Sequence, residues 1–148
     1  MTQPPETSVK NMGSLKPGAV ALVAEDEALI RMEAADMLAD AGFGVFEAST
    51  AGAALGYLEA HPEVILVMTD IRMPGPSDGL ALAHAVRARW PEMGIIIVSG
   101  RVFPTPAELP RGAHFIGKPY HVSQIRQVLR EMGMTKPHAQ HSLRQTET

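Results

Sequence analysis

Side chains that could bind a cation and a phosphate group follow the apolar runs of this sequence. The runs AVALVA, VILVMT, GIIIV and AHFIG end at Glu25 and Asp26, at Asp70, at Ser99 and at Lys118, in that order. Carboxylate oxygens suit hard cations such as Mg²⁺, and an ammonium group suits a phosphate oxygen. If these residues lie side by side, they could bind a cation and a phosphoryl group together.

The carboxylates of Glu25, Asp26 and Asp70 need a counter-charge if they lie together. Three such groups within a few ångströms repel one another and raise each other's pKa unless a cation sits among them. Mg²⁺ fits, because it takes oxygen ligands and usually keeps waters and a substrate phosphate in its shell. Lys118 would be redundant for the metal alone, but not if a phosphoryl group is held as well. Asp70 is then the expected in-line nucleophile.

Short apolar runs that alternate with helical patterns predict the elements that would position these residues. The runs are typical of strands buried on both faces of a parallel sheet. Strands are predicted over 19–24, 44–48, 64–70, 94–99 and 113–118, and helices over about 30–41, 50–61, 82–90 and 125–132. Parallel strands all end along one edge, where such sheets bind ligands. The sequence therefore predicts one α/β domain over 19–132.

The connection between the fourth and fifth predicted strands leaves no room for a long helix. It reads GRVFPTPAELPRGA, and Pro104, Pro106 and Pro110 each lack the backbone N–H that a helix interior needs. Thr105 to Glu108 has the order of a capping box, with proline at the first helical position. We therefore expect a single turn that ends before Pro110.

Composition argues against several classes of function. The 148 residues carry a net charge of -3 with no run of Lys or Arg, so nucleic acid is a poor partner. Cysteine is absent, which excludes disulfides, thiolate nucleophiles and thiolate metal sites. Neither a signal peptide nor a membrane-spanning run is evident, so we expect a cytoplasmic protein without membrane contact. Residues 1–18 and 133–148 lack apolar periodicity and are predicted to be disordered tails, too short for an output domain.

Four motifs, in order and on the expected elements, resemble the receiver domain of bacterial two-component response regulators. They are the acidic pair at Glu25 and Asp26, TDIRMPGPSDG around Asp70, VSG ending the fourth strand and GKPY ending the fifth. The likeness covers about residues 19–132. It implies a flavodoxin-like, doubly wound five-stranded parallel sheet of order 2-1-3-4-5 with helices on both faces. Here the fourth helix would be shortened or missing.

The resemblance assigns roles around the metal. Asp70 resembles the phosphoacceptor, and Glu25 and Asp26 resemble the acidic pair around Mg²⁺. The backbone carbonyl of Arg72 resembles a further metal ligand. Asp70 would thus form an aspartyl phosphate, with magnesium as the only cofactor.

Other residues resemble the parts of the family that respond to the phosphoryl group. Ser99 resembles the hydroxyl that turns inward to a phosphoryl oxygen, and Lys118 resembles the amine that pairs with another. The Lys118–Pro119 bond is similar to the family's cis peptide, which would aim the lysine. Phe115 occupies the position of the switch aromatic, and Gly100 would leave an open path for the phosphodonor.

Arg72 and Arg101 each lie two residues beyond a site residue. In the family such positions border the phosphoryl group and influence how fast it hydrolyses. One interpretation is that both are solvated side chains. Our hypothesis is that they hinder the attacking water and so lengthen the lifetime of the phosphorylated protein.

The resemblance implies a stand-alone response regulator. A sensor histidine kinase or a histidine phosphotransfer protein would donate a phosphoryl group to Asp70, and an unknown downstream protein would receive the signal. A phosphate shuttle or sink is the other form of output. The protein would be a signalling protein rather than an enzyme, since it would catalyse only its own phosphorylation and dephosphorylation.

Three other classes of protein fit these residues less well. A flavodoxin-like nucleotide or flavin binder needs a phosphate-cradling loop after a strand, whereas the first such loop here is the acidic AEDEA. A degenerate receiver that only binds partners would not need the full acidic and lysine set. A haloacid-dehalogenase-type phosphatase wants a second aspartate two residues after the nucleophile, where this chain has Arg72.

Overall fold

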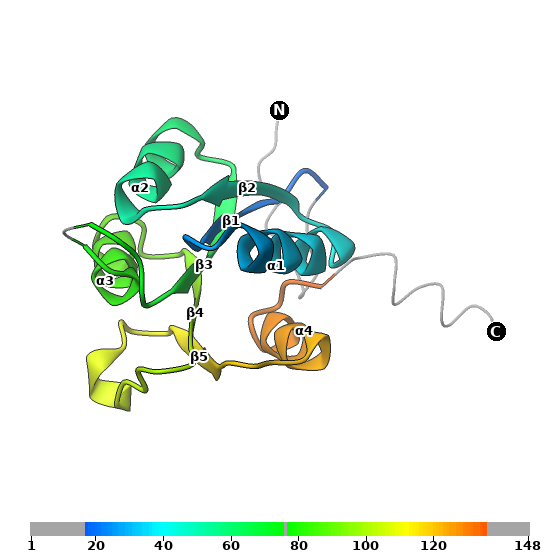
Figure 1. Ribbon diagram of the computed structural model, residues 1–148. Helices are drawn as coiled ribbons and strands as arrows, with labels where there is room; N and C mark the ends of the chain where they lie inside the picture. Colours follow the sequence, from blue (N-terminus) through cyan, green and yellow to red (C-terminus); the bar gives the residue numbers. More distant parts are fainter. Residues whose placement is uncertain (1–16, 76, 136–148) are drawn as a thin grey trace.

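A five-stranded parallel sheet carries the fold of this computed structural model, which describes residues 17–75 and 77–135. The strands are β1 (Val20–Ala24), β2 (Gly44–Ala48), β3 (Val64–Asp70), β4 (Gly94–Ser99) and β5 (His114–Gly117). Their order is β2-β1-β3-β4-β5, and every neighbouring pair is parallel (Figure 1). The predicted fold class and strand order are confirmed.

Helices cover both faces of the sheet, as predicted. They are α1 (Ala28–Asp40), α2 (Ala51–Ala60), α3 (Gly79–Arg89) and α4 (Val122–Glu131). Helices α1 and α4 lie on one face, and α2 and α3 lie on the other (Figure 1). This arrangement leaves the carboxyl ends of the strands along one edge.

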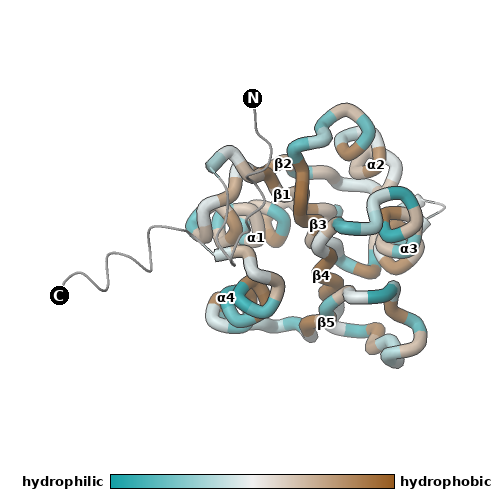
Figure 2. The backbone as a smooth tube through the Cα atoms, turned by 180° about the vertical axis from the view of Figure 1, so that it is seen from behind, coloured by the Kyte–Doolittle hydropathy of each residue, from teal (hydrophilic) through white to brown (hydrophobic). Residues whose placement is uncertain are grey.

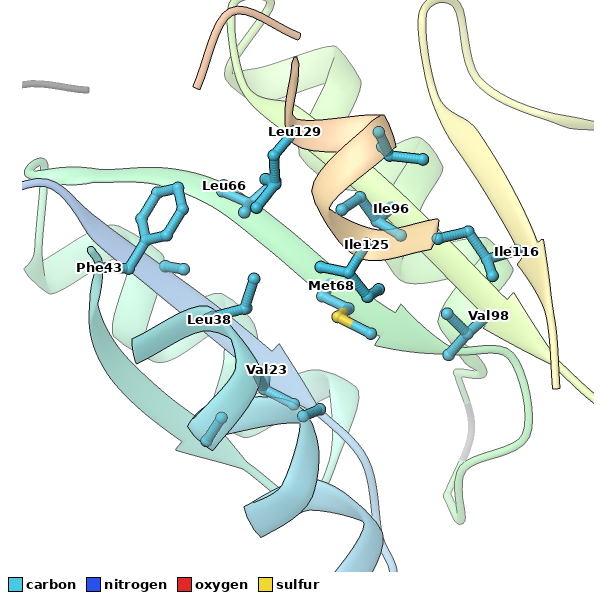
Figure 3. Packing of buried hydrophobic residues seen from close by; sticks show 14 of the residues in the cluster. Val23, Leu38, Phe43, Leu66, Met68, Ile96, Val98, Ile116, Ile125 and Leu129 are labelled. Carbon is cyan, nitrogen blue, oxygen red and sulfur yellow. The ribbon is translucent and has the colours of Figure 1, made fainter. Parts of the chain in front are cut away.

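Two apolar layers hold the helices to the sheet, because successive side chains of a strand point to opposite faces. In β3, Leu66 and Met68 join the layer under α1 and α4, whereas Val67 joins the layer under α2 and α3. Figure 3 shows Leu38 of α1 and Ile125 of α4 packed over the strands. Apolar residues follow the strands in Figure 2. A sheet buried on both faces is a rigid base for the side chains at its edge.

Side chains cap the first turns of α2 and α3. Thr50 Oγ1 accepts the amide of Ala53 at 3.0 Å at the start of α2. Asp78 Oδ1 accepts the amide of Ala81 at 2.9 Å at the start of α3. Such caps satisfy backbone donors that the first turn leaves unpaired, so they define where each helix begins.

Between β4 and β5, where the structure describes every residue, the fourth helix of the expected pattern is absent and one 3₁₀ turn, η2 (Pro106–Glu108), takes its place. The Glu108 carboxylate reaches back to the amide of Thr105, which donates at 2.7 Å. Both the missing helix and the position of the turn confirm the prediction. We call residues 100–113 the crossover.

Side chains of α3 hold the crossover in place of that helix. His84 Nε2 lies 2.7 Å from the carbonyl oxygen of Glu108, and because a carbonyl only accepts, the ring N–H donates. One turn further on, Arg87 Nε donates to the carbonyl oxygen of Arg111 at 2.7 Å. These contacts satisfy carbonyl groups of the crossover that have no helix to pair them.

The predicted tails lie almost entirely outside the described residues. Among residues 17–75 and 77–135, no helix is long and apolar enough to cross a membrane.

Candidate functional site

The carboxyl ends of four strands bring the predicted site residues together. Asp70 and Ser99 are the last residues of β3 and β4, Glu25 follows β1, and Lys118 follows β5. Asp26, Asp70, Ser99 and Lys118 line one open hollow of about 840 Å³. The sheet places these five residues together because all its strands run in the same direction.

Three carboxylates form the acidic part of the site. Each of Glu25, Asp26 and Asp70 offers an oxygen within 4.8 Å of the others. Glu25 and Asp70 are buried, with 3% and 7% of their surface exposed, whereas Asp26 is exposed. An all-oxygen donor set of this charge matches a hard divalent cation such as Mg²⁺. The residues present therefore fit the metal that the sequence predicted.

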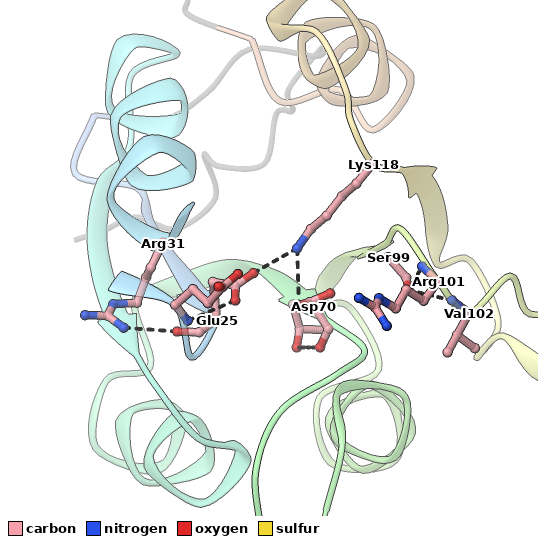
Figure 4. A network of polar contacts seen from close by, with 9 residues as sticks. Glu25, Arg31, Asp70, Ser99, Arg101, Val102 and Lys118 are labelled. Atoms are coloured by element: carbon pink, nitrogen blue, oxygen red, sulfur yellow. Dashed lines mark hydrogen bonds and ion pairs between the residues drawn. The ribbon is translucent and has the colours of Figure 1, made fainter. Parts of the chain in front are cut away.

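Lys118 supplies the positive charge that the buried carboxylates need. Its Nζ donates to Glu25 Oε1 at 3.1 Å and forms an ion pair with Asp70 Oδ2 at 3.3 Å (Figure 4). The lysine thus bridges the two buried acids from the end of the edge strand β5. The same ammonium group would face a phosphoryl oxygen on Asp70.

Burial and pairing shift the titration of this group of residues. Burial raises the pKa of Glu25 above 4.5, and the charge of Asp70 adds to this, although hydrogen bonds from the Glu27 amide and Lys118 oppose it. Burial would lower the pKa of Lys118, but its hydrogen bond to Glu25 and the charge of Asp70 outweigh burial and raise it above 10.5. Lys118 is consequently held in its charged form.

The Ser99 hydroxyl is buried and already engaged with the crossover. Its Oγ accepts the amides of Arg101 and Val102 at 3.2 Å and 3.0 Å (Figure 4). A hydroxyl has one donor proton as well as two acceptor lone pairs, so the Ser99 O–H can still donate to a neighbouring oxygen. Ser99 therefore joins the site to the first residues of the crossover.

Gly79 is a site residue that the sequence reasoning did not single out. A Cβ at this position would overlap the carbonyl oxygen of Asp70, and the Gly79 amide donates to the carbonyl of Ile71 at 2.8 Å. The first residue of α3 thus packs directly against the backbone of Asp70. A glycine directly after the capping Asp78 was the available signal, but the contact itself depends on how α3 meets β3.

The remaining predicted residues surround the hollow or lie next to it. Phe115 is half-buried against the layer under α2 and α3, and the Lys118–Pro119 bond is cis, as the resemblance implied. Gly100 is exposed and lines the hollow. Arg72 and Arg101 are also exposed and line the same hollow as Asp70.

Comparison with protein families and curated relatives agrees with this geometry. A family model described as "Response regulator receiver domain" matches residues 21–130. "Sensor kinase CckA" of Brucella abortus (strain 2308) is 33% identical over 131 residues, which make up 86% of this chain and 14% of that protein. "Transcriptional regulatory protein PdtaR" of Mycobacterium tuberculosis (strain ATCC 25618 / H37Rv) is 31% identical over 107 residues, or 70% of this chain and 51% of that protein. The chain spans about half or less of the length of these relatives.

Solved structures share the fold. The response regulator receiver protein from Sinorhizobium medicae WSM419 matches with a TM-score of 0.73 and 27% identity, over 78% of this chain and 94% of that one. The receiver domain of NtrX from Brucella abortus matches with a TM-score of 0.68 and 31% identity, over 76% and 96%.

Proposed function

This chain belongs to the family of response regulator receiver domains, and we propose that Asp70 accepts a phosphoryl group from a phosphohistidine in a Mg²⁺-dependent step. The observation that carries the proposal is the position of Asp70. Its carboxylate ends a rigid strand, lies 3.3 Å from the Lys118 ammonium and shares its site with the oxygens of Glu25 and Asp26. A carboxylate, a positive counter-charge and oxygens suited to a hard cation therefore lie at one point, which supports the proposal.

In the proposed step, a carboxylate oxygen of Asp70 attacks phosphorus and forms the acyl phosphate. The bond from phosphorus to the histidine nitrogen breaks, and the electron pair leaves with the imidazole. Glu25, Asp26, Asp70 and the carbonyl of Arg72 would hold Mg²⁺, whose positive charge would offset that of the transferring group. Attack of water on phosphorus later returns the Asp70 carboxylate and releases inorganic phosphate.

Lys118 and Ser99 would stabilise the phosphorylated form. The Lys118 ammonium, now paired with Asp70 and Glu25, would pair with a phosphoryl oxygen. The Ser99 O–H would donate to another oxygen while its Oγ accepts from the crossover amides. The phosphoryl group would thereby gain a direct hydrogen-bonded connection to the crossover.

The partner class follows from the donor chemistry. We propose that the donor is a sensor histidine kinase or a histidine phosphotransfer protein, and that output is a protein contact or onward transfer of the phosphoryl group. We place this signalling in the cytoplasm, where histidine kinases present their phosphohistidine. Action as a stand-alone regulator, without an attached output domain, stays a prediction.

Intact-protein mass spectrometry tests the proposal. The protein is incubated with acetyl phosphate, with and without Mg²⁺, as wild type, Asp70→Asn and Asp78→Asn. Asp78 lines the same hollow, and asparagine caps a helix as well as aspartate does, so this variant is a matched control. We expect one phosphoryl adduct on the wild type and the control, only with Mg²⁺, and none on Asp70→Asn. An adduct that persists in Asp70→Asn, or that is absent from the wild type, would contradict the proposal.

A further inference from the structure

We infer that Arg31 is a positioning residue for the cation site, because its guanidinium fixes the peptide group that joins Glu25 to Asp26. This inference deepens the proposed function and rests on it. Arg31 is the fourth residue of α1 and does not line the hollow. Its two side-chain hydrogen bonds go to the Glu25 backbone and to Glu47, not to a carboxylate of the acidic cluster formed by Glu25, Asp26 and Asp70. Its effect on the metal would be transmitted through the backbone.

The contacts of Arg31 form a fork between two elements. Nη1 donates to the backbone carbonyl oxygen of Glu25 at 3.0 Å, and Nε donates to Glu47 Oε1 of β2, also at 3.0 Å (Figure 4 shows the first). The Arg31 side chain is 20% exposed, and that of Glu47 is 38% exposed. Glu47 thus anchors the guanidinium from the edge strand while the other end of the fork holds the chain after β1.

The Glu25 carbonyl is the point at which the sheet no longer fixes the chain. The amide of Glu25 still donates to Ala48 of β2 at 3.0 Å, which continues the ladder beyond Ala24. The Glu25 carbonyl and the Asp26 amide belong to one planar peptide group, so holding the oxygen sets the direction in which Asp26 leaves the strand. Asp26 is the exposed member of the acidic cluster and lacks the packing that fixes Asp70. A tie at this peptide therefore has the largest effect on Asp26.

The charge of Arg31 would by itself act in the opposite direction. Residues 19–63 contain nine Asp and Glu residues but one basic residue of the Lys or Arg type, which is Arg31. A positive charge close to a cation site repels the cation, so its removal should tighten Mg²⁺ binding if charge were its whole effect. Positioning predicts the reverse, because a loosened Asp26 must be ordered again when the metal binds. The sign of the change therefore separates the two roles.

Lysine should not replace this arginine. The planar guanidinium presents Nε and Nη1 in a fixed fork, whereas a lysine ammonium is a single charged centre on a flexible stem. Arg31→Lys keeps the charge and loses the simultaneous contacts with Glu25 and Glu47. Glu47→Ala instead keeps the arginine and removes its anchor on β2.

The test measures the Mg²⁺ dissociation constant of the full chain by titration calorimetry, for the wild type, Arg31→Lys, Arg31→Gln and Glu47→Ala. Groups that orient metal ligands typically change affinity by about 10–100-fold, and we expect about tenfold weaker binding for both Arg31 variants. Glu47→Ala should weaken binding less, and adding it to Arg31→Gln should cause no further loss. The amide resonance of Asp26 in the metal-free protein should shift in all three variants.

Arg89→Lys is the matched control, since Arg89 also joins two elements, through an ion pair with Glu59 of α2 at 2.8 Å. It should leave the Mg²⁺ dissociation constant unchanged. Tighter binding by Arg31→Gln with unchanged binding by Arg31→Lys would show that only charge matters and would overturn the inference. So would a lower melting temperature with unaltered Mg²⁺ affinity in the Arg31 variants. If the wild type itself bound no Mg²⁺, the proposed function would fail first, which is a distinct result.

Discussion

Phe103 of the crossover lies edge-on against Phe115 of β5, with ring centroids 6.0 Å apart and an interplanar angle of 74°. Phe103 is 64% exposed, so it covers Phe115 while remaining at the surface itself. The amide one residue before Phe103, that of Val102, donates to Ser99 Oγ. A short path thus runs from the candidate site to Phe115, the position that the family resemblance associates with switching.

The contact between the Phe103 and Phe115 rings should stabilise the fold and respond to a mimic of the phosphoryl group. Edge-to-face aromatic pairs contribute about 0.5–1.5 kcal/mol beyond their buried area, so Phe103→Ala should lower the free energy of unfolding by about that amount. In the wild type, addition of beryllium fluoride with Mg²⁺ should shift the resonances of Val102 and of both rings. The path would be refuted by large shifts at Asp70 with none in residues 101–115.

Replacement of Gly79 should disturb Asp70 directly. A methyl group there overlaps the Asp70 carbonyl, so Gly79→Ala should displace the end of β3 or the start of α3. Overpacking of this kind costs about 1–3 kcal/mol, which urea unfolding would detect. Phosphorylation of Asp70 by acetyl phosphate should also slow.

Gly56→Ala provides the control for that change. Gly56 lies inside α2, and a Cβ there meets nothing within 4 Å. Alanine is about 1 kcal/mol better than glycine in a helix interior, so Gly56→Ala should stabilise the protein. Equal effects of the two substitutions would argue against a special contact at Gly79.

Arg87 should be needed for the order of the crossover. Its guanidinium donates to the carbonyl oxygens of Arg111, Pro91 and Met93 at 2.7 Å, 3.0 Å and 2.7 Å. Arg87→Ala should cost about 1–3 kcal/mol, because hydrogen bonds from charged donors are among the stronger ones. Hydrogen exchange should quicken across residues 105–113. The exposed Arg126 of α4 offers a control, and Arg126→Ala should alter neither quantity.

Acidification should weaken Mg²⁺ binding. The loss of binding should begin at a higher pH than it would with a glutamate of ordinary pKa. The pKa of Glu25 is raised above 4.5 by burial, so protons compete with the cation in mildly acidic solution. Lys118→Met removes a group that lowers this pKa and should move the loss of binding to higher pH. Calorimetric titrations between about pH 5 and pH 8 would measure this. An unchanged midpoint in Lys118→Met would contradict the assignment.

The stability of the metal-free protein should depend on pH through the titration of Glu25 and Lys118. Burial raises the folded-state pKa of Glu25. The stability that this group contributes is therefore fully present below pH 4.5 and is lost as the pH rises through the folded-state pKa. The pKa of Lys118 is also raised in the folded state, so the stability that it contributes is present below pH 10.5 and is lost as the pH rises through the folded-state pKa. Melting temperatures measured against pH without Mg²⁺ should decline in both regions.

Arg72 and Arg101 should lengthen the lifetime of the phosphorylated protein. Both are exposed and line the hollow that contains Asp70, where they can hinder the approach of water. Changing both to alanine should shorten the half-life of the acyl phosphate, followed by mass spectrometry after removal of the phosphodonor. An unaltered half-life would leave them as solvated side chains.

Much of the site could be predicted because it depends on local patterns. Runs buried on both faces predict parallel strands, and the topology of such a sheet brings Glu25, Asp70 and Lys118 to one edge. Thr50 caps α2 and the prolines prevent a fourth helix through chemistry that acts within a few residues. The resemblance added the strand order and the cis bond before Pro119.

The distant groups that support the site are set by the packing of the fold. Arg31 reaches Glu47, and His84 and Arg87 reach carbonyls of the crossover, across separations of 16 and 24 residues. Gly79 meets the Asp70 carbonyl because of the angle at which α3 meets β3. Neither spacing nor composition encodes such contacts, since a backbone carbonyl has no sequence signature and its partner is set by packing. The order of residues in the chain thus specifies the chemistry at the sheet edge, whereas the packing of the fold specifies what holds that chemistry in place.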